Sequence, residues 1–199
     1  MIDIGANLTH DSFDDDRETV IAEAKAAGVT GFIITGSDMS CSQKAIKLAH
    51  QHSDCCYATA GIHPHHAKDY NQALMSELSA LLNDEKVVAV GETGLDYFRD
   101  FSPRPQQIKS FEGHIELAIK TGLPMFLHQR DAHVDFLPIL KQQRDQLSDV
   151  VVHCFTDSKQ ALYDYLDLDC YIGITGWVCD ERRGQHLLDL IHDIPLNRF

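Results

Sequence analysis

The chain is poor in basic residues and has no long apolar run. Its 17 Lys and Arg residues face 30 Asp and Glu residues, and the formal net charge is −13. This charge excludes a broad basic surface that coats nucleic acid, but it is compatible with a small site in which a metal ion supplies positive charge. No stretch approaches the roughly 18 apolar residues that a membrane span needs, so we predict no membrane association.

The chain also lacks a Cys-x-x-Cys motif, and no leader segment is visible at its start. Its six cysteines form no Cys-x-x-Cys motif, which argues against a structural zinc site of that kind. Cys56, Cys154 and Cys170 lie in or beside strand-like runs, a placement typical of buried, reduced thiols in a cytosolic protein. The first residues contain no basic region followed by an apolar segment, so we expect a cytoplasmic protein without a secretory signal.

Four short apolar runs each lead into a residue that can bind a metal or transfer a proton. These residues are His63, Glu92, His128 and His153, separated by 29, 36 and 25 positions. A short, continuous apolar run predicts a strand buried on both faces, and the separations suit one strand and one helix each. Side chains at the same end of neighbouring parallel strands converge, so we expect these four residues to meet.

Strand-like and helix-like segments alternate along the whole chain. The predicted strands are 2–8, 31–36, 55–62, 87–91, 124–128, 150–155 and 170–175. The predicted helices are 15–27, 40–52, 74–82, 104–121, 132–146, 158–167 and 181–192. Because each helix returns the chain to the starting edge, this alternation predicts a parallel sheet.

Two architectures fit this alternation, an open doubly wound sheet and a TIM-type (β/α)8 barrel. The open sheet of a dinucleotide-binding protein needs a Gly-rich fingerprint after the first strand, and residues 5–9 do not supply one. Functional residue types at the ends of many strands favour the barrel, because closure brings them to one centre. We predict a single α/β domain over residues 1–199, a barrel that lacks its last strand and its C-terminal helices.

The strand-end residues suggest a metal site. Two imidazoles and a carboxylate can hold a divalent ion, and His128 and His153 are the best imidazole candidates. Glu92 can bridge two ions, which would position a phosphate oxygen and lower the pKa of a bound water. The structural alternatives are core histidines bonded to the backbone and, for Glu92, a solvated loop acid.

Three further residues are candidates for substrate binding. Pro64 stiffens the chain between His63 and His65, and these two side chains can bind phosphate or a second metal. Their alternative is a place on a mobile surface loop. Arg130 can contact a phosphate as a bidentate donor, or it can pair with Asp131 or another acid instead.

Five segments in order along the chain resemble the TatD family of metal-dependent deoxyribonucleases. They are Gly61-Ile-His-Pro-His, Gly91-Glu-Thr-Gly-Leu-Asp, Leu127-His-Gln-Arg-Asp-Ala, Val152-His-Cys-Phe-Thr and Tyr171-Ile-Gly-Ile-Thr-Gly. The resemblance implies a cytoplasmic TIM-barrel hydrolase that acts on DNA, with RNA as a further candidate, from the 3′ end with Mg²⁺ or a similar ion. It also implies Glu92, His128 and His153 as the metal ligands.

The chain departs from the family pattern at two places. Many members carry His-x-His at the end of the first strand, where this chain has Gly5 and Asn7, and this difference favours a harder, water-rich ion such as Mg²⁺. The family also places a metal-binding aspartate at the end of the eighth strand, and this sequence stops at Phe199, where that strand should begin. We therefore expect a natural continuation of roughly 60 residues, and lost or reduced activity in the 199-residue chain.

The leading functional hypothesis is a monomeric, metal-dependent 3′–5′ exonuclease acting on single strands, with Glu92 as the catalytic residue. A terminal nucleotide unstacks at little cost, and Phe98, Phe101 or Trp177 can stack on it unless they pack in the core. Two alternatives are hydrolysis of another ester or amide, and a chain that binds a metal or a partner without turnover.

Overall fold

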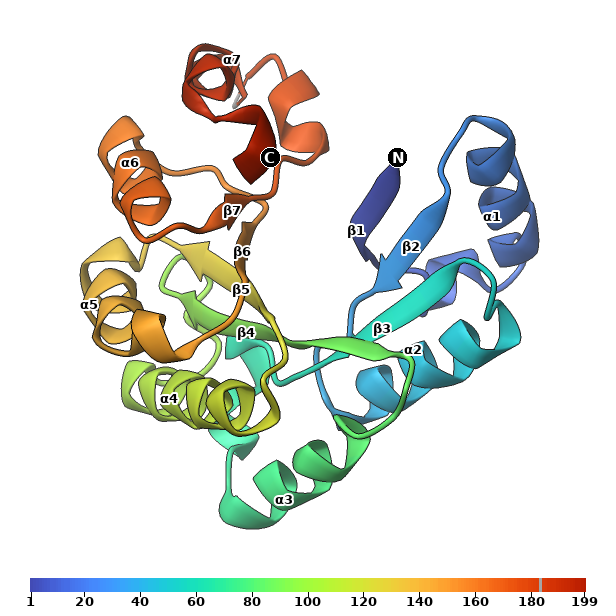
Figure 1. The fold of residues 1–199 in the computed structure, drawn as a ribbon, viewed down its shortest axis with the longest axis horizontal. Coiled ribbons are helices and arrows are strands. Elements are labelled where there is room, and N and C mark those ends of the chain that lie inside the picture. The colour runs from blue at the N-terminus through green and yellow to red at the C-terminus, as the bar shows by residue number, and fades with distance from the viewer. Residues whose placement is uncertain (183) are drawn as a thin grey trace.

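The computed structural model describes residues 1–182 and 184–199, and a curled parallel sheet is its main element. Each of the seven strands pairs in parallel with its neighbours in sequence. The strands are β1 (Ile2–Ala6), β2 (Gly31–Ile34), β3 (Cys56–Ala60), β4 (Val87–Asp96), β5 (Met125–Arg130), β6 (Val150–His153) and β7 (Tyr171–Ile172). β1 and β7 face each other across the open side of the curl (Figure 1). The predicted barrel without its closing strand is confirmed.

Helices cover the outer face of the sheet (Figure 1). The α-helices are α1 (Arg17–Ala26), α2 (Met39–Gln51), α3 (Gln72–Leu81), α4 (Arg104–Thr121), α5 (His133–Gln143), α6 (Lys159–Asp167) and α7 (Gln185–Leu190). Short 3-10 turns are η1 (Asp11–Phe13), η2 (Pro64–Asp69), η3 (Arg144–Gln146), η4 (Gly176–Cys179), η5 (Ile191–Asp193) and η6 (Leu196–Arg198). Each predicted helix is present. α4 has the predicted ends, and the other helices have shifted ones. Residue 183 of the predicted helix 181–192 lies outside the described residues. No helix in the described ranges is long and apolar enough to cross a membrane.

Polar caps fix several helix starts just after the strands. The side chains of Asp38, Asn71 and Ser158 each accept a hydrogen bond from a backbone N–H in the first turn of α2, α3 and α6. Such caps satisfy backbone donors that the helix itself leaves unpaired. They hold each helix start in a fixed place at the edge of the sheet where the strands end.

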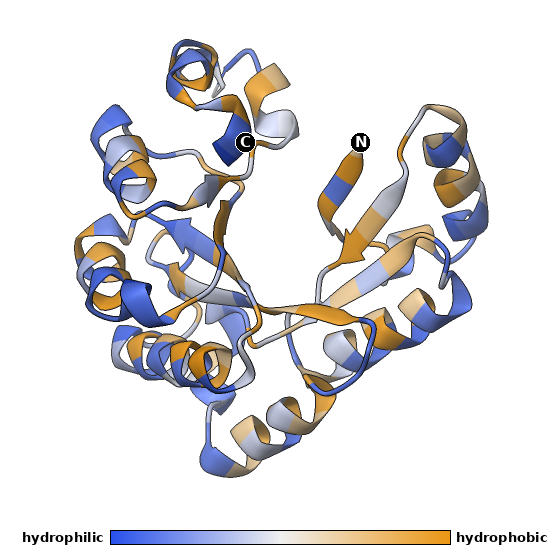
Figure 2. Ribbon diagram, in the orientation of Figure 1, coloured by the Kyte–Doolittle hydropathy of each residue, from blue (hydrophilic) through white to orange (hydrophobic). Residues whose placement is uncertain are grey.

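The main hydrophobic core lies between the sheet and the helices. The outward-facing side chains of Ile34 and Val150 are fully buried, whereas Ile4 on the inner face is 38% exposed. Figure 2 shows orange, hydrophobic stretches along the sheet beside hydrophilic ones, and helices that carry both colours. An apolar cavity of about 280 Å³ lies on the inner face, lined by Ile33 and Val151 among others. The inner face is only half buried because the curl is open on one side.

β4 is longer than the sequence predicts. The prediction ends this strand at Gly91 and places Glu92 after it, but β4 continues to Asp96 and pairs with β5 up to Arg130. The register shifts between Gly91 and Thr93, so Glu92 is the extra residue of a β-bulge. A bulge re-aims one side chain, and here it presents a carboxylate from a strand rather than from a loop.

The backbone of β4 explains why glycines flank this bulge. Gly91 and Gly94 have φ angles of 140° and 135°, and β-carbons at these positions would overlap the carbonyl oxygens of Phe126 and His128. The two glycines therefore allow the backbones of β4 and β5 to approach closely.

Candidate active site

The four predicted strand-end residues lie at the same edge of the sheet. His63 follows β3, Glu92 lies in β4, His128 in β5 and His153 at the end of β6. The register pairs His128 with His153, and their ring centroids are 6.4 Å apart. The ring centroids of His63 and His128 are 4.5 Å apart. The predicted convergence of these side chains is confirmed.

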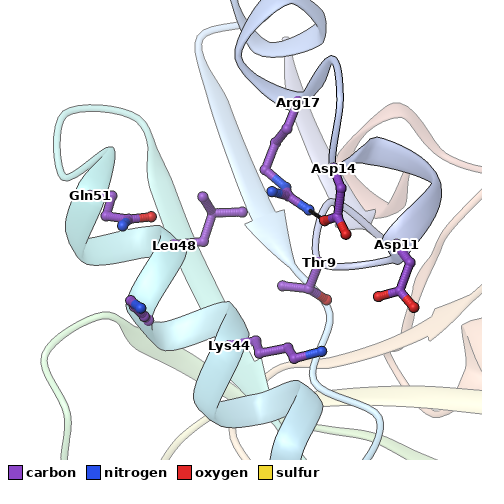
Figure 3. Close-up of a pocket in the computed structure, with 8 residues that line it drawn as sticks. Thr9, Asp11, Asp14, Arg17, Lys44, Leu48 and Gln51 are labelled. Atoms are coloured by element: carbon purple, nitrogen blue, oxygen red, sulfur yellow. Dashed lines mark hydrogen bonds and ion pairs between the residues drawn. The ribbon is translucent and has the colours of Figure 1, made fainter.

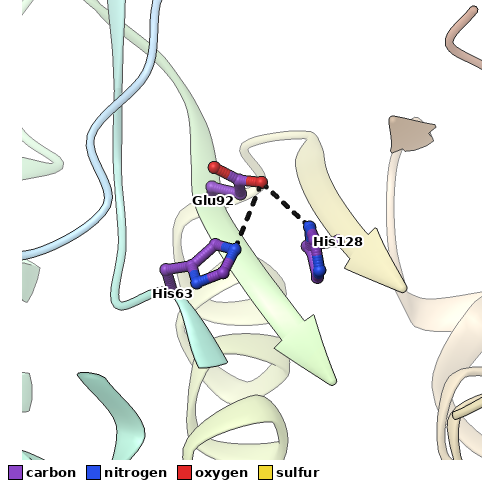
Figure 4. Close-up of side chains that lie close together, drawn as sticks. All are labelled: His63, Glu92 and His128. Carbon is purple, nitrogen blue, oxygen red and sulfur yellow. Dashed lines mark ion pairs between the residues drawn. The ribbon is translucent and has the colours of Figure 1, made fainter. Parts of the chain in front are cut away.

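One oxygen of Glu92 lies at the centre of this group. Its Oε1 atom is 3.1 Å from His153 Nε2, 3.2 Å from His128 Nδ1 and 3.6 Å from His63 Nε2. Figure 4 shows the carboxylate reaching toward His63 and His128 from between them. The Glu92 side chain is only 12% exposed, which rules out the solvated loop acid.

The group has a defined charge distribution. Burial disfavours the Glu92 carboxylate, but hydrogen bonds from His128 and His153 outweigh it and hold the pKa of Glu92 well below its usual range. Burial also disfavours the charged form of His128, yet hydrogen bonds to Asp96 and Glu92 raise its pKa to about 9. Burial lowers the pKa of His63 to about 3. At neutral pH and without a bound metal, Glu92 is therefore ionised, His128 is protonated and His63 is neutral.

Asp96 holds the imidazoles of His65 and His128, a role that sequence reasoning missed. Its Oδ2 atom accepts hydrogen bonds from His65 Nε2 at 2.9 Å and from His128 Nε2 at 3.2 Å. Its Oδ1 atom accepts from the backbone N–H of Arg99 at 2.8 Å, and the residue is 1% exposed. The even spacing from Glu92 to Asp96 is the signal that could have placed both on one face of a strand.

Two of the three predicted substrate-binding residues, His65 and Arg130, lie at the mouth of the site, whereas His63 is buried beside Glu92. His65 is 30% exposed and its ring centroid is 4.8 Å from that of Phe101. The Arg130 guanidinium carbon lies 3.8 Å from the ring centroid of Phe98 and 5.6 Å from that of Trp177. Both predicted residues therefore contact aromatic side chains close to His128.

A cavity of about 330 Å³ opens beside Glu92. Its lining consists of Gly5, Asn7, Thr35, Ser37, His63, His65, His66, Glu92 and His153. A β-carbon on Gly5 would lie 3.0 Å from the Phe126 ring and 3.4 Å from His153 Nδ1, so a larger side chain there would displace a neighbour. Sequence reasoning missed Thr35 and Ser37, although polar residues directly after a strand are a usable signal.

The donor set fits a divalent ion. One ligand atom from each of His63, Glu92 and His128 lies within 4.8 Å of the others. Imidazole nitrogens with a carboxylate oxygen suit first-row divalent metals, and carboxylates and water suit Mg²⁺. The resemblance implies His153 in place of His63, and His153 contacts the same Glu92 oxygen. Glu92 and His128 belong to both groups.

A second cavity, of about 430 Å³, lies outside this site between the η1 region and α2 (Figure 3). Its lining carries side chains of both charges, and Arg17 Nη2 lies 2.6 Å from Asp14 Oδ1. Its lining includes Lys44 and Lys47 and no histidine or cysteine. It does not offer the metal-binding or acid–base chemistry of the Glu92 cavity.

Residues 2–199 match the family model of the TatD related DNase. The chain belongs to this family. The 3′-5′ ssDNA/RNA exonuclease TatD of Erwinia tasmaniensis is 46% identical over 199 residues, which are 100% of this chain and 77% of that relative. The exonuclease of the same name from Edwardsiella piscicida is also 46% identical, with 100% and 76% covered. The resemblance inferred from five motifs is confirmed.

Solved structures of TatD proteins have the same fold. A TatD homologue of Escherichia coli superposes with a TM-score of 0.91 at 29% identity, covering 100% of this chain and 76% of that one. A hydrolase of the TatD family from Entamoeba histolytica gives a TM-score of 0.90 at 30% identity, covering 100% and 71%. The predicted barrel architecture and the predicted class, a hydrolytic nuclease, are both confirmed.

Proposed function

We propose that this TatD-family chain is a metal-dependent 3′–5′ exonuclease that hydrolyses phosphodiester bonds of single-stranded DNA and RNA. The observation that carries the proposal is the buried Glu92 oxygen in contact with three imidazoles. The names of its relatives supply the substrate class and the direction. The protein is proposed to act in the cytoplasm as a monomer.

Glu92 and His128 are the metal ligands that we propose first, because both the family resemblance and the mutual distances select them. His153 and His63 contact the same Glu92 oxygen and complete the set. We propose Mg²⁺ as the ion, since Gly5 and Asn7 leave the first strand without imidazoles and so favour a water-rich coordination. A divalent ion, when bound, supplies Lewis-acid polarisation of a phosphate oxygen.

The other site residues orient the ligands and the substrate. Asp96 accepts from His128 Nε2 and so fixes the ring with its Nδ1 atom toward Glu92. A carboxylate behind a ligating histidine is a common supporting contact at metal sites. Arg130 and His65, at the mouth, are proposed to bind the phosphate of the strand, with the planar guanidinium as a bidentate donor.

Glu92→Gln tests the proposal, because the amide keeps the size of the side chain and removes its charge. In a form as long as the TatD relatives, we expect a rate of nucleotide release from 3′-labelled single strands at least tenfold lower, about 1.4 kcal/mol of barrier, and weaker Mn²⁺ binding by calorimetry. Glu85→Gln is the matched control, an exposed acid just before β4 at its far end. Retention of more than about a tenth of the wild-type rate would falsify the bridging role.

The substrate class has its own test. The wild-type protein should release mononucleotides from single strands in the presence of a divalent ion, and a chelator should stop the release. Hydrolysis of amides or lactones in place of phosphodiesters would overturn the proposed function.

A further inference from the structure

Two exposed phenylalanines lie on the loop that joins β4 to α4. Phe98 and Phe101 are 54% and 60% exposed, and both follow Asp96 within five residues. Exposed phenylalanine does not stabilise a fold, because its ring stays in contact with water. Two such rings beside a buried charged group therefore require another explanation.

Each ring is supported on one side by a group at the mouth of the site. The Arg130 guanidinium carbon is 3.8 Å from the Phe98 ring centroid, and that of Arg99 is 5.7 Å away. The imidazole of His65 is 4.8 Å from the Phe101 ring centroid. Arg130 and His65 come from the elements that carry the site, β5 and η2, and Arg99 lies on the loop itself. The rest of each ring remains open to a ligand.

The loop is anchored before any ligand arrives. Asp96 accepts from the backbone N–H of Arg99, and the Gln107 side-chain amide donates to the carbonyl oxygens of Asp96 and Ser102. Ser102 is fully buried, and its hydroxyl donates to the carbonyl oxygen of His65 at 3.0 Å. The loop therefore presents its aromatic rings without a large ordering cost on binding.

We propose that Phe98 and Phe101 are stacking platforms for the two unpaired nucleobases at the 3′ end of a single strand, and that they set the selectivity for unpaired ends. The inference deepens the proposed exonuclease function and rests on it. Bases stack on aromatic rings without regard to sequence, and bases within a duplex are not free to do so. A chain with net charge −13 gains affinity from stacking where it lacks a basic groove.

Equilibrium binding tests the platforms without requiring turnover. The probe is a 5′-fluorescein hexathymidylate, measured by fluorescence anisotropy with Ca²⁺ in place of Mg²⁺. Phe98→Ala and Phe101→Ala should each weaken binding roughly tenfold, the loss of one base–aromatic contact. Phe98→Trp and Phe101→Trp should bind like the wild type, because an aromatic ring is kept.

A second probe separates stacking from a structural effect. A hexamer with two abasic sites at its 3′ end should bind more weakly to the wild type, and the two alanine variants should weaken it no further. Tyr163→Ala is the matched control, an aromatic ring 40% exposed on α6 with the ammonium of Lys159 5.5 Å from its centroid. It should bind both probes like the wild type.

Failure of the platforms and failure of the proposed function give different results. Alanine variants that bind the hexathymidylate like the wild type, or that lose equal affinity for the abasic probe, overturn the platforms. Hydrolysis of bis(p-nitrophenyl) phosphate by the wild type needs no base stacking. Suppose that the wild type hydrolyses no bis(p-nitrophenyl) phosphate with any divalent ion, yet binds the hexathymidylate more tightly than the abasic hexamer. This result would overturn the proposed nuclease function and support the stacking platforms.

Discussion

His114 shows how a buried residue outside the site sets the backbone next to it. It is fully buried in α4, its Nε2 atom accepts a hydrogen bond from the Ile62 backbone N–H at 3.0 Å, and its Nδ1–H donates to the Ser110 carbonyl oxygen at 2.6 Å. Only a neutral imidazole can make both contacts, with one nitrogen as acceptor and the other as donor. His114 thereby holds the chain immediately before His63.

The stability of the fold should depend on pH through His114. Burial lowers its pKa to about 4, whereas the unfolded chain has a value of about 6.5. The unfolded state therefore binds more protons in this window, and the contribution is full above pH 6.5 and is lost as the pH falls through about 4. We expect a loss of about 3 kcal/mol, which urea unfolding at several pH values would measure.

The variant His114→Gln isolates this effect from the other titrating groups. It should be less stable than the wild type at neutral pH and should lose less stability between pH 6.5 and 4. The exposed His192 provides the control His192→Gln, whose pH profile should follow the wild type. Parallel pH profiles for His114→Gln and the wild type would contradict the assignment.

Single residues of the site were predictable where a strand end specified them. His63, Glu92, His128 and His153 each follow an apolar run, so their convergence could be inferred before any coordinates. The two contacts of His128, with Glu92 and with Asp96, could not be inferred from the sequence, because they depend on how the bulge turns the side chains of β4.

At the scale of elements, β4 is the strand on which the site depends. The sequence placed its start at Val87, but the predicted strand ended at Gly91, whereas β4 continues to Asp96. Register with a neighbouring strand decides whether such a glycine ends a strand or lets two backbones approach, and register is not visible in one sequence. Helix bounds were easier to predict. In α4, for example, the apolar periodicity and the final Gly122 mark the helix and its end directly.

Gly94→Ala should destabilise the protein far more than Gly122→Ala. Both glycines have positive φ angles, 135° and 73°. A β-carbon at Gly94 would overlap the His128 carbonyl oxygen, whereas one at Gly122 meets nothing within 4 Å. We expect a loss on the order of 3 kcal/mol at Gly94, from strain and overlap together, and about 1 kcal/mol at Gly122 from strain alone.

Urea unfolding curves of the two variants measure this difference directly. Because both substitutions add one methyl group at a positive φ angle, the difference between them reports the overlap between β4 and β5 together with the less favourable φ angle at Gly94. Equal midpoints for the two variants would mean that β4 and β5 can separate at no cost, and the bulge would not hold Glu92 in place.

For the whole molecule, the alternation of strands and helices predicted a parallel sheet, and the functional residue types at the strand ends then favoured a barrel over an open sheet. The openness of the curl follows from the strand count, since β1 and β7 each have a single neighbour in the described sheet. The relatives are longer, and this chain spans 77% of the exonuclease from Erwinia tasmaniensis. Composition also predicted an acidic surface, although it could not locate the few cations near the site.

Those few cations set the salt dependence of strand binding. Arg104 pairs with Asp100 at 3.3 Å, while Arg99 and Arg130 stack on Phe98 beside the site. We therefore expect roughly two to four phosphate contacts. The slope of log K against log salt should then be about −1.4 to −2.8, at about −0.7 per contact on single strands.

Arg130→Gln should reduce the magnitude of this slope by about 0.7, and Lys141→Gln, at an exposed position on α5, should leave the slope unchanged. Anisotropy titrations over a range of salt concentrations give these slopes, and a slope near about −6 would require a long basic groove that this acidic chain does not have.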